Sequence, residues 1–202
     1  MENIIPLFPT PLYSTNIGVD YDIPLKNIQL RLDQRDNGGG ISLDQEYLLK
    51  TKSLKKSIDK EIEIYLRKYL RLKTTVGLKH QCSWLLVHKK GDFSPKHYHS
   101  NSWLSGIYYY KVQPNSGDLV FHTQPPYGWS CSSMYPLSEV EDFNYLNSNE
   151  FFITPKEGDL FLFPSHLVHN SKSSESDYDR MCISFNYTLH GKWGSNTSII
   201  NI

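Results

Sequence analysis

Apolar residues recur at three- and four-residue spacing between residues 53 and 73. The positions that share this spacing are Leu54, Ile58, Ile62, Tyr65, Leu66 and Tyr69. Such residues line up on one face of an α-helix, and charged residues cover the opposite face. We therefore predict a helix over residues 53–73 whose role is to pack on a sheet.

From residue 80 onward the pattern of apolar positions is typical of strands. Six short segments are rich in β-branched and aromatic residues; they read HQCSWLLVHK, WLSGIYYYKV, GDLVFHT, FFITP, DLFLFPS and MCISFNYTL. Turn-forming stretches such as KKGD, QPNSGD, PKEGD and SSESD lie among them. Many short strands after a helix predict a mainly β fold, a sandwich or barrel with helical support on one side.

The rest of the chain is less regular. Residues 6–22 contain three prolines and are expected to form an extended entry arm. Residues 35–42 read as a flexible loop. Ser42 followed by Gln45 resembles a capping box, which predicts a short helix there.

Residues 125–150 interrupt the regular spacing of the strands with a polar and aromatic insertion. The insertion is too long for a hairpin turn, and long loops on β scaffolds tend to carry function. We therefore expect substrate contacts in it, from Tyr127, Trp129 and Tyr135.

Length and composition limit the classes of function. With 202 residues, one domain is expected, in which residues 1–75 form the arm and supporting helix and residues 76–202 the β core. Acidic and basic residues balance at 21 each, which gives no reason to expect nucleic acid or a membrane as partner. Three widely spaced cysteines predict neither a disulfide framework nor a structural zinc site. With no signal-peptide pattern and no apolar run approaching roughly 18 residues, we expect a cytoplasmic protein.

Two groups of histidines stand out from the eight in the chain. In an extended segment His97 and His99 point to the same face, so both can reach a single metal ion. A second group, His166 and His169, follows the strand DLFLFPS. The remaining histidines are read as structural, except His122, which together with His166 could lie behind the metal ligands or beside the substrate.

Eleven residues after His169, Arg180 opens a strand on which Cys182, Ser184 and Asn186 share its face. An apolar strand has no structural need for an inward arginine. Because a buried guanidinium requires an anion and its planar fork suits a carboxylate, Arg180 predicts a carboxylate-binding site.

The order of these motifs resembles that of the iron(II)- and 2-oxoglutarate-dependent oxygenases, in their small prolyl-hydroxylase-like branch. The residues that carry the resemblance are HYH at 97–99, SGIYYY at 105–110, SGDLVF at 116–121, TPKEGDLFLFPSHLVH at 154–169, and Arg180. Within the branch the chain is most similar to a group of bacterial and phage proteins. The first 75 residues contribute only the FPTPLY arm.

The resemblance implies a double-stranded β-helix, or jelly roll, with iron at its open end. By position in the motif, the metal ligands would be His97, His99 and His169. Arg180 would bind the far carboxylate of 2-oxoglutarate with Tyr109, and Ser184 and Asn186 are weaker candidates for contacts with this cosubstrate.

The reaction implied is hydroxylation of a C–H bond coupled to decarboxylation of 2-oxoglutarate to succinate, with Fe²⁺, 2-oxoglutarate and O₂ as cofactors. The expected partner is a small-molecule or peptide substrate, such as a peptidyl side chain, an amino acid or a metabolite. Asn101 is a weak candidate for contact with it. A homodimer is compatible with these expectations.

Position 99 departs from the family pattern, in which this ligand is a carboxylate. Three neutral imidazoles can bind iron(II), but they leave the site one unit more positive, which should raise the iron potential and tighten the hold on 2-oxoglutarate. Two other arrangements stay open at this point. His99 and Asn101 could form the ligand pair, or a carboxylate such as Asp118 could bind from an adjacent strand.

Two other functions compete with the oxygenase. One is a cupin-like three-histidine metal enzyme that does not use 2-oxoglutarate. The other is a non-catalytic jelly-roll binding module in which the histidines are incidental. Arg180 discriminates against the cupin-like enzyme, which has no need for an inward arginine, and iron content after anaerobic purification separates the binding module from the two enzymes.

Overall fold

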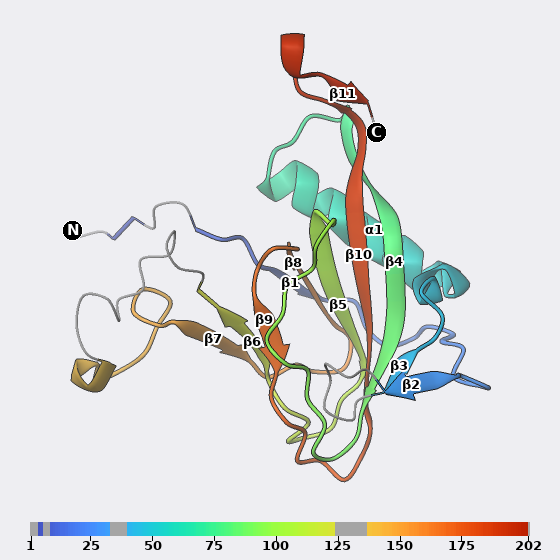
Figure 1. Cartoon of the computed structure of the whole chain (residues 1–202), viewed down its shortest axis with the longest axis vertical. Helices are drawn as coiled ribbons and strands as arrows, with labels where there is room; N and C mark the ends of the chain where they lie inside the picture. Colours follow the sequence, from blue (N-terminus) through green and yellow to red (C-terminus); the bar gives the residue numbers. More distant parts are fainter. Residues whose placement is uncertain (1–3, 6–8, 33–39, 124–136, 202) are drawn as a thin grey trace.

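Two facing β-sheets and a helix on the outside of the larger sheet make up the described part of the chain (Figure 1). The structure is a computed structural model that describes residues 4–5, 9–32, 40–123 and 137–201. Tyr127, Trp129 and Tyr135, expected in substrate contacts, lie outside the described residues, as does most of the loop predicted at 35–42. No described helix is long and apolar enough to cross a membrane.

The larger sheet has the strand order β1-β8-β5-β10-β4-β3-β2, and β11 pairs with the end of β10. Its neighbouring strands are antiparallel. The bounds are Tyr13–Asn16 for β1, Leu30–Leu32 for β2, Gly40–Ser42 for β3, Val76–His88 for β4, Leu104–Lys111 for β5, Asp159–Pro164 for β8, Arg180–Trp193 for β10 and Ile200–Asn201 for β11.

The smaller sheet has the order β7-β6-β9, also antiparallel. Its strands are β6 (Leu119–His122), β7 (Glu150–Ile153) and β9 (His169–Ser171). Three single-turn 3₁₀ helices complete the elements: η1 (Tyr47–Lys50), η4 (Leu137–Glu139) and η5 (Asn196–Ser198). All six predicted strands are present, and the mainly β prediction is confirmed.

The alternation of side chains along β10 separates two cores. Ile183 and Phe185 face the helix and pack with Leu54 and Ile58 in one cluster. Cys182 faces the smaller sheet and packs with Phe121 and other residues in a second cluster. Arg180, Ser184 and Asn186 share the face of Cys182, so the parity read from the sequence places them between the sheets.

The predicted helix ends earlier than its apolar pattern suggested. The α-helix α1 spans Lys52–Ile64, and a π-helical turn, η2, follows at Tyr65–Tyr69. Arg71 then takes a left-handed backbone conformation (φ 53°), which ends the helix before residue 73. The guanidinium of Arg67 donates to the carbonyl oxygens of Lys73 (2.8 Å) and Val76 (2.8 Å) and fixes the turn into β4.

The capping box predicted at Ser42 and Gln45 is wrong. Ser42 ends β3, and its Oγ accepts a hydrogen bond from the backbone N of Leu85 (3.0 Å) instead of capping a helix. The short helix η1 begins after Glu46 without a side-chain cap. The Ser42 hydroxyl, which the local pattern assigned to a helix cap, therefore bonds to the backbone of the neighbouring strand β4 instead.

Candidate active site

His97 and His169 are paired through their backbones at the mouth of the space between the sheets. His97 N donates to His169 O (3.0 Å), and His169 N donates to His97 O (2.9 Å). His99 N donates to Ser165 O (2.9 Å). These three bonds hold residues 97–99 extended along the segment between β8 and β9, so His97 and His99 project to the same side.

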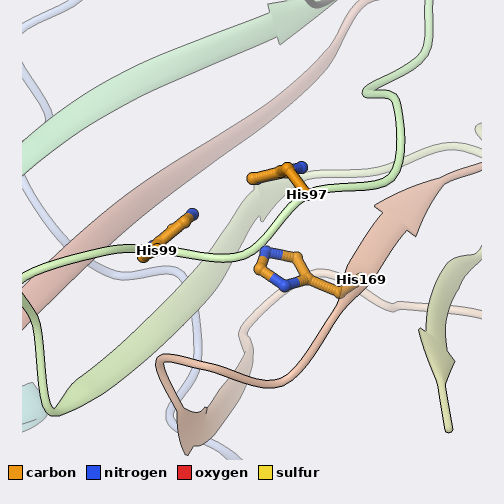
Figure 2. Close-up of side chains that lie close together, drawn as sticks. All are labelled: His97, His99 and His169. Atoms are coloured by element: carbon orange, nitrogen blue, oxygen red, sulfur yellow. The ribbon is translucent and has the colours of Figure 1, made fainter. Parts of the chain in front are cut away.

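The three imidazole rings lie close together (Figure 2). One ligand nitrogen from each of His97, His99 and His169 lies within 4.8 Å of the other two. A metal–nitrogen bond to histidine is about 2.1 Å long, so modest ring rotations bring all three nitrogens onto one ion.

Hydrogen bonds at Nδ1 fix which nitrogen of each ring faces the common point. Nδ1 of His97 donates to Pro95 O (2.8 Å), and Nδ1 of His169 donates to Leu167 O (2.9 Å). With the proton held on Nδ1, the lone pair of each ring is on Nε2. Burial, together with the charge of neighbouring His97, lowers the pKa of His169 to about 3, so this ring is neutral and able to bind a metal.

His99 is oriented by a polar network on the two central strands. Its Nδ1 donates to Asn186 Oδ1 (2.6 Å), and Ser105 Oγ lies 2.9 Å from the same nitrogen. Ser105 Oγ is also 2.8 Å from Asn186 Oδ1 and 2.9 Å from Ser165 Oγ. Asn186, a candidate for contact with 2-oxoglutarate, is thus placed against the ring at position 99. A neutral amide here holds the histidine as a carboxylate or carbonyl does in other metal sites.

Arg180 lies deeper on the same face and is almost fully buried, with 2% of its surface exposed. Nη1 donates to Ser116 O (2.9 Å) and Gly117 O (3.0 Å), and Nη2 donates to Nδ1 of His88. Nε has no partner in the described part of the chain. Because a guanidinium carries five N–H donors and three are engaged, Nε–H and one Nη2–H remain along one edge, which is the fork that binds a carboxylate.

His88 supports this arginine. It is fully buried and stands opposite Arg180 on the adjacent strand. Burial and the charge of Arg180 lower the pKa of His88 to about 3, so the ring is neutral and its Nδ1 accepts a hydrogen bond from Arg180. Its other nitrogen lies 3.4 Å from Ser94 Oγ. The sequence pattern had assigned His88 a purely structural role, although its parity with Leu86 places it on the face of the site.

One cavity of about 290 Å³ joins the histidines to the arginine. Its lining includes all three histidines, Arg180, Tyr109 and Ser184. Burial raises the pKa of Tyr109, so its hydroxyl stays protonated and can donate. The unpaired, buried Nε of this cavity-lining arginine suits a carboxylate ligand, since a buried unsatisfied donor costs about 1–3 kcal/mol.

Comparison with known proteins identifies the family. A family model described as "Putative 2OG-Fe(II) oxygenase", where 2OG is 2-oxoglutarate, matches residues 82–186, more than half of the chain. This chain belongs to that family. The 2OG-Fe(II) oxygenases use Fe²⁺, 2-oxoglutarate and O₂, and the three imidazoles and the open edge of Arg180 fit the first two. No curated protein sequence matches the chain.

Solved structures of 2OG-Fe(II) oxygenases share the fold. HygX from Streptomyces hygroscopicus, with nickel, 2-oxoglutarate and hygromycin B bound, is 13% identical with a TM-score of 0.54, over 89% of this chain and 83% of that chain. The epimerase SnoN from nogalamycin biosynthesis is 12% identical with a TM-score of 0.54, over 83% and 70%. A prolyl hydroxylase from Trichoplax adhaerens in complex with a hypoxia inducible factor peptide is 16% identical with a TM-score of 0.51, over 78% and 66%. The predicted jelly roll and superfamily are confirmed.

The two alternative ligands of this oxygenase lie away from the histidines. Asp118 accepts a hydrogen bond from Thr154 Oγ1 (2.7 Å) and pairs with Lys172 (3.7 Å) at a separate depression between turns. Asn101 is exposed in a left-handed turn (φ 58°) and is not among the described residues that line the cavity.

The other two candidate histidines, His122 and His166, differ in burial. His122 is buried and bridges Glu150 (3.0 Å) and Asn170 Oδ1 (2.5 Å), and Asn170 lines the cavity next to His169. His166 is exposed on the connection between β8 and β9. His122 therefore lies behind the cavity wall, whereas His166 faces outward.

Proposed function

We propose that this 2OG-Fe(II) oxygenase is a hydroxylase whose iron is held by His97, His99 and His169. One oxygen atom of O₂ would enter a substrate C–H bond as a hydroxyl group, and the other would enter 2-oxoglutarate, which is converted to succinate and CO₂. The observation that carries the proposal is that one cavity is lined both by the imidazole cluster and by Arg180, whose buried Nε has no hydrogen-bond partner among the described residues.

Each cavity residue has a distinct part in binding. The Nε–H and Nη2–H of Arg180 would donate to the far carboxylate of 2-oxoglutarate as a bidentate pair. The Tyr109 hydroxyl, kept protonated by burial, would donate to the same carboxylate. His88 and the carbonyls of Ser116 and Gly117 hold the guanidinium plane in place for this contact. Iron held at the three histidines would supply the oxygen chemistry.

The three-histidine set changes the charge of the site. The cavity wall carries no acidic residue among its described members, so the ligands do not offset the charge of the metal. With His99 in the place of a carboxylate, dianionic 2-oxoglutarate becomes the main neutralising group. We therefore expect tight coupling, in which iron and 2-oxoglutarate each bind more strongly when the other is present.

The test follows the fate of oxygen. The protein, loaded with iron(II) and 2-oxoglutarate, is exposed to ¹⁸O₂ with a mixture of peptides, amino acids and small metabolites, and succinate and products are measured by mass spectrometry. Hydroxylation predicts a product heavier by one ¹⁸O atom and one ¹⁸O atom in succinate. Two similar structures are described as an epimerase and a carbocyclase. A product without added oxygen would place this chain with such chemistry and contradict the hydroxylase.

A further inference from the structure

Arg31 lies at the outer end of the cavity, on the edge strand β2. The register of the larger sheet forms one row of facing residues in which Tyr109 is opposite Cys182, Cys182 is opposite Leu86, Leu86 is opposite Ile41, and Ile41 is opposite Arg31. Directly opposed residues of antiparallel strands share a face of the sheet. Arg31 is therefore on the side of the sheet that carries the site.

The charge of Arg31 has no partner among the described residues. The side chain is exposed, and no hydrogen bond or ion pair joins it to another residue in the described part of the chain. The described lining of the cavity includes no aspartate or glutamate that would compete for this cation. A guanidinium without a carboxylate at the mouth of a cavity is suited to bind an anion from solution.

Arg31 and Arg180 serve different anions. They lie on β2 and β10, which are three strand spacings apart, or about 14 Å. In the proposed function 2-oxoglutarate has one carboxylate at Arg180 and its other end at the histidine-bound iron, so neither end is available to Arg31. The anion for Arg31 must therefore belong to another molecule in the same cavity.

An apolar surface lies between Arg31 and the histidines. Ile41 and Leu86 are buried in the row described above, and Trp84 lines the cavity one row nearer to the metal ligands. The ring centroids of Trp84 and His99 are 5.7 Å apart. A ligand that extends from Arg31 toward the histidines thus passes over aliphatic and aromatic side chains.

We propose that the substrate carries a carboxylate or phosphate group that pairs with Arg31, and an apolar part that lies on Trp84 and Leu86. The inference rests on the proposed function, because it takes Arg180 to be occupied by 2-oxoglutarate. The anion is several bonds away from the carbon that is oxidised, because β2 is the strand farthest from the histidine cluster on this side of the sheet.

The test uses matched probes on protein loaded with nickel(II), which binds in place of iron without turnover, and with saturating 2-oxoglutarate. The probes are 4-phenylbutanoate, 3-phenylpropylphosphonate and the neutral 4-phenylbutanamide, and their dissociation constants are measured by ligand-observed NMR. Wild type is compared with Arg31→Gln, Arg31→Lys and Arg180→Met. Lys79→Gln is the control, because it removes a cation from an exposed position on β4 outside the described cavity lining.

We expect wild type to bind an anionic probe up to about five-fold more tightly than the amide, as for an exposed charge pair. Arg31→Gln should abolish this preference, Arg31→Lys should keep part of it, and Lys79→Gln should leave it unchanged. The tighter of the two anionic probes identifies the group as carboxylate or phosphate. Equal binding of anion and amide by wild type, or a preference that survives Arg31→Gln, would overturn the inference.

Binding of 2-oxoglutarate to the same variants separates this inference from the proposed function. Arg180→Met should weaken 2-oxoglutarate and leave the discrimination between anionic probe and amide intact. If Arg180→Met leaves 2-oxoglutarate affinity unchanged, the proposed function fails, while the probes still decide the role of Arg31. If instead Arg180→Met removes the preference for the anionic probe, the probe binds at the deep end and the Arg31 proposal is wrong.

Discussion

His99 is the residue at which this site departs from the carboxylate pattern of its family. The structure surrounds it with groups that orient a ring: Asn186 and Ser105 contact its Nδ1, and Trp84 packs beside it. These contacts leave Nε2 directed toward His97 and His169. They support a specific role for an imidazole at this position.

The first prediction concerns this ligand. His99→Ala should weaken iron(II) binding by at least ten-fold, because one of three protein ligands is lost, whereas His99→Asp should keep more iron because a carboxylate is a ligand that iron(II) accepts readily. Anaerobic iron(II) titration of the folded variants measures both. His190→Ala, at an exposed position far along β10, is the control and should bind as wild type does. Equal iron affinity in His99→Ala and His99→Asp would remove position 99 from the ligand set.

A second prediction concerns the carboxylate fork of Arg180. Arg180→Met should raise the dissociation constant of 2-oxoglutarate by roughly thirty-fold or more, since losing a charge-assisted bidentate pair costs about 2–5 kcal/mol. Iron binding should be retained, because Arg180 does not reach the histidines. Calorimetric titration with 2-oxoglutarate in the presence of nickel(II) measures the effect. An unchanged dissociation constant would contradict the assignment.

The roles of single residues could be predicted from the sequence only where the alternation of side chains along one strand shows which face a residue is on. The parity of β10 placed Arg180, Ser184 and Asn186 on the inner face, and the spacing of His97 and His99 placed both on one side. The partners across strands could not be predicted in this way. That His88 faces Arg180 and that Ser105 contacts His99 depend on the register between strands far apart in sequence.

At the scale of elements, the strands with strong apolar patterns were predicted, and five short strands without such a pattern were not. The strands β1, β2, β3, β9 and β11 have at most four residues each, and their identity comes from the strands they join. Pairing, not local propensity, thus decides these five strands. The consequence for function is direct, because β9 carries His169 and β2 carries Arg31.

A third prediction tests the packing of the two central strands. A Cβ atom at Gly106 would lie 2.3 Å from ring atoms of Phe185 and 2.9 Å from Leu162 Cδ2. Gly106→Ala should therefore lower the free energy of unfolding by about 1–3 kcal/mol through overpacking, as measured by urea denaturation. The matched control is Gly77→Ala on β4, where the added Cβ lies 3.6 Å from its nearest neighbour and no loss is expected. Equal stability of the two variants would contradict the packing described for β5 and β10.

At the scale of the whole molecule, the fold keeps two uncharged histidines in its interior, and this links stability to pH. The pKa values of His88 and His169 are both lowered to about 3 from their ordinary value of 6.5. The unfolded chain takes up protons at these residues below pH 6.5, but the folded protein does not do so until near pH 3. The stability that they contribute is therefore complete above pH 6.5 and is lost as the pH falls toward 3.

The fourth prediction isolates the part of this dependence that belongs to His88. In metal-free protein, His88→Gln should lose stability less steeply than wild type between pH 6.5 and 3, by up to about 1.4 kcal/mol per pH unit, because one proton fewer is taken up on unfolding. Glutamine can still accept a hydrogen bond from Arg180, so the fold should be retained. Urea denaturation at several pH values measures the slopes. Parallel curves for the two proteins would show that His88 titrates normally in the folded state.

The most direct test of the central claim, that one cavity binds iron through three histidines and 2-oxoglutarate through Arg180, is an anaerobic titration of the protein with iron(II) and 2-oxoglutarate, followed by visible absorption. The chelate of 2-oxoglutarate on iron(II) produces a charge-transfer band that neither component gives alone. We predict that the band saturates at one iron and one 2-oxoglutarate per chain, is lost in His97→Ala, and requires far more 2-oxoglutarate in Arg180→Met. Iron binding without a band that depends on 2-oxoglutarate, or a band unaffected by both substitutions, would contradict the account.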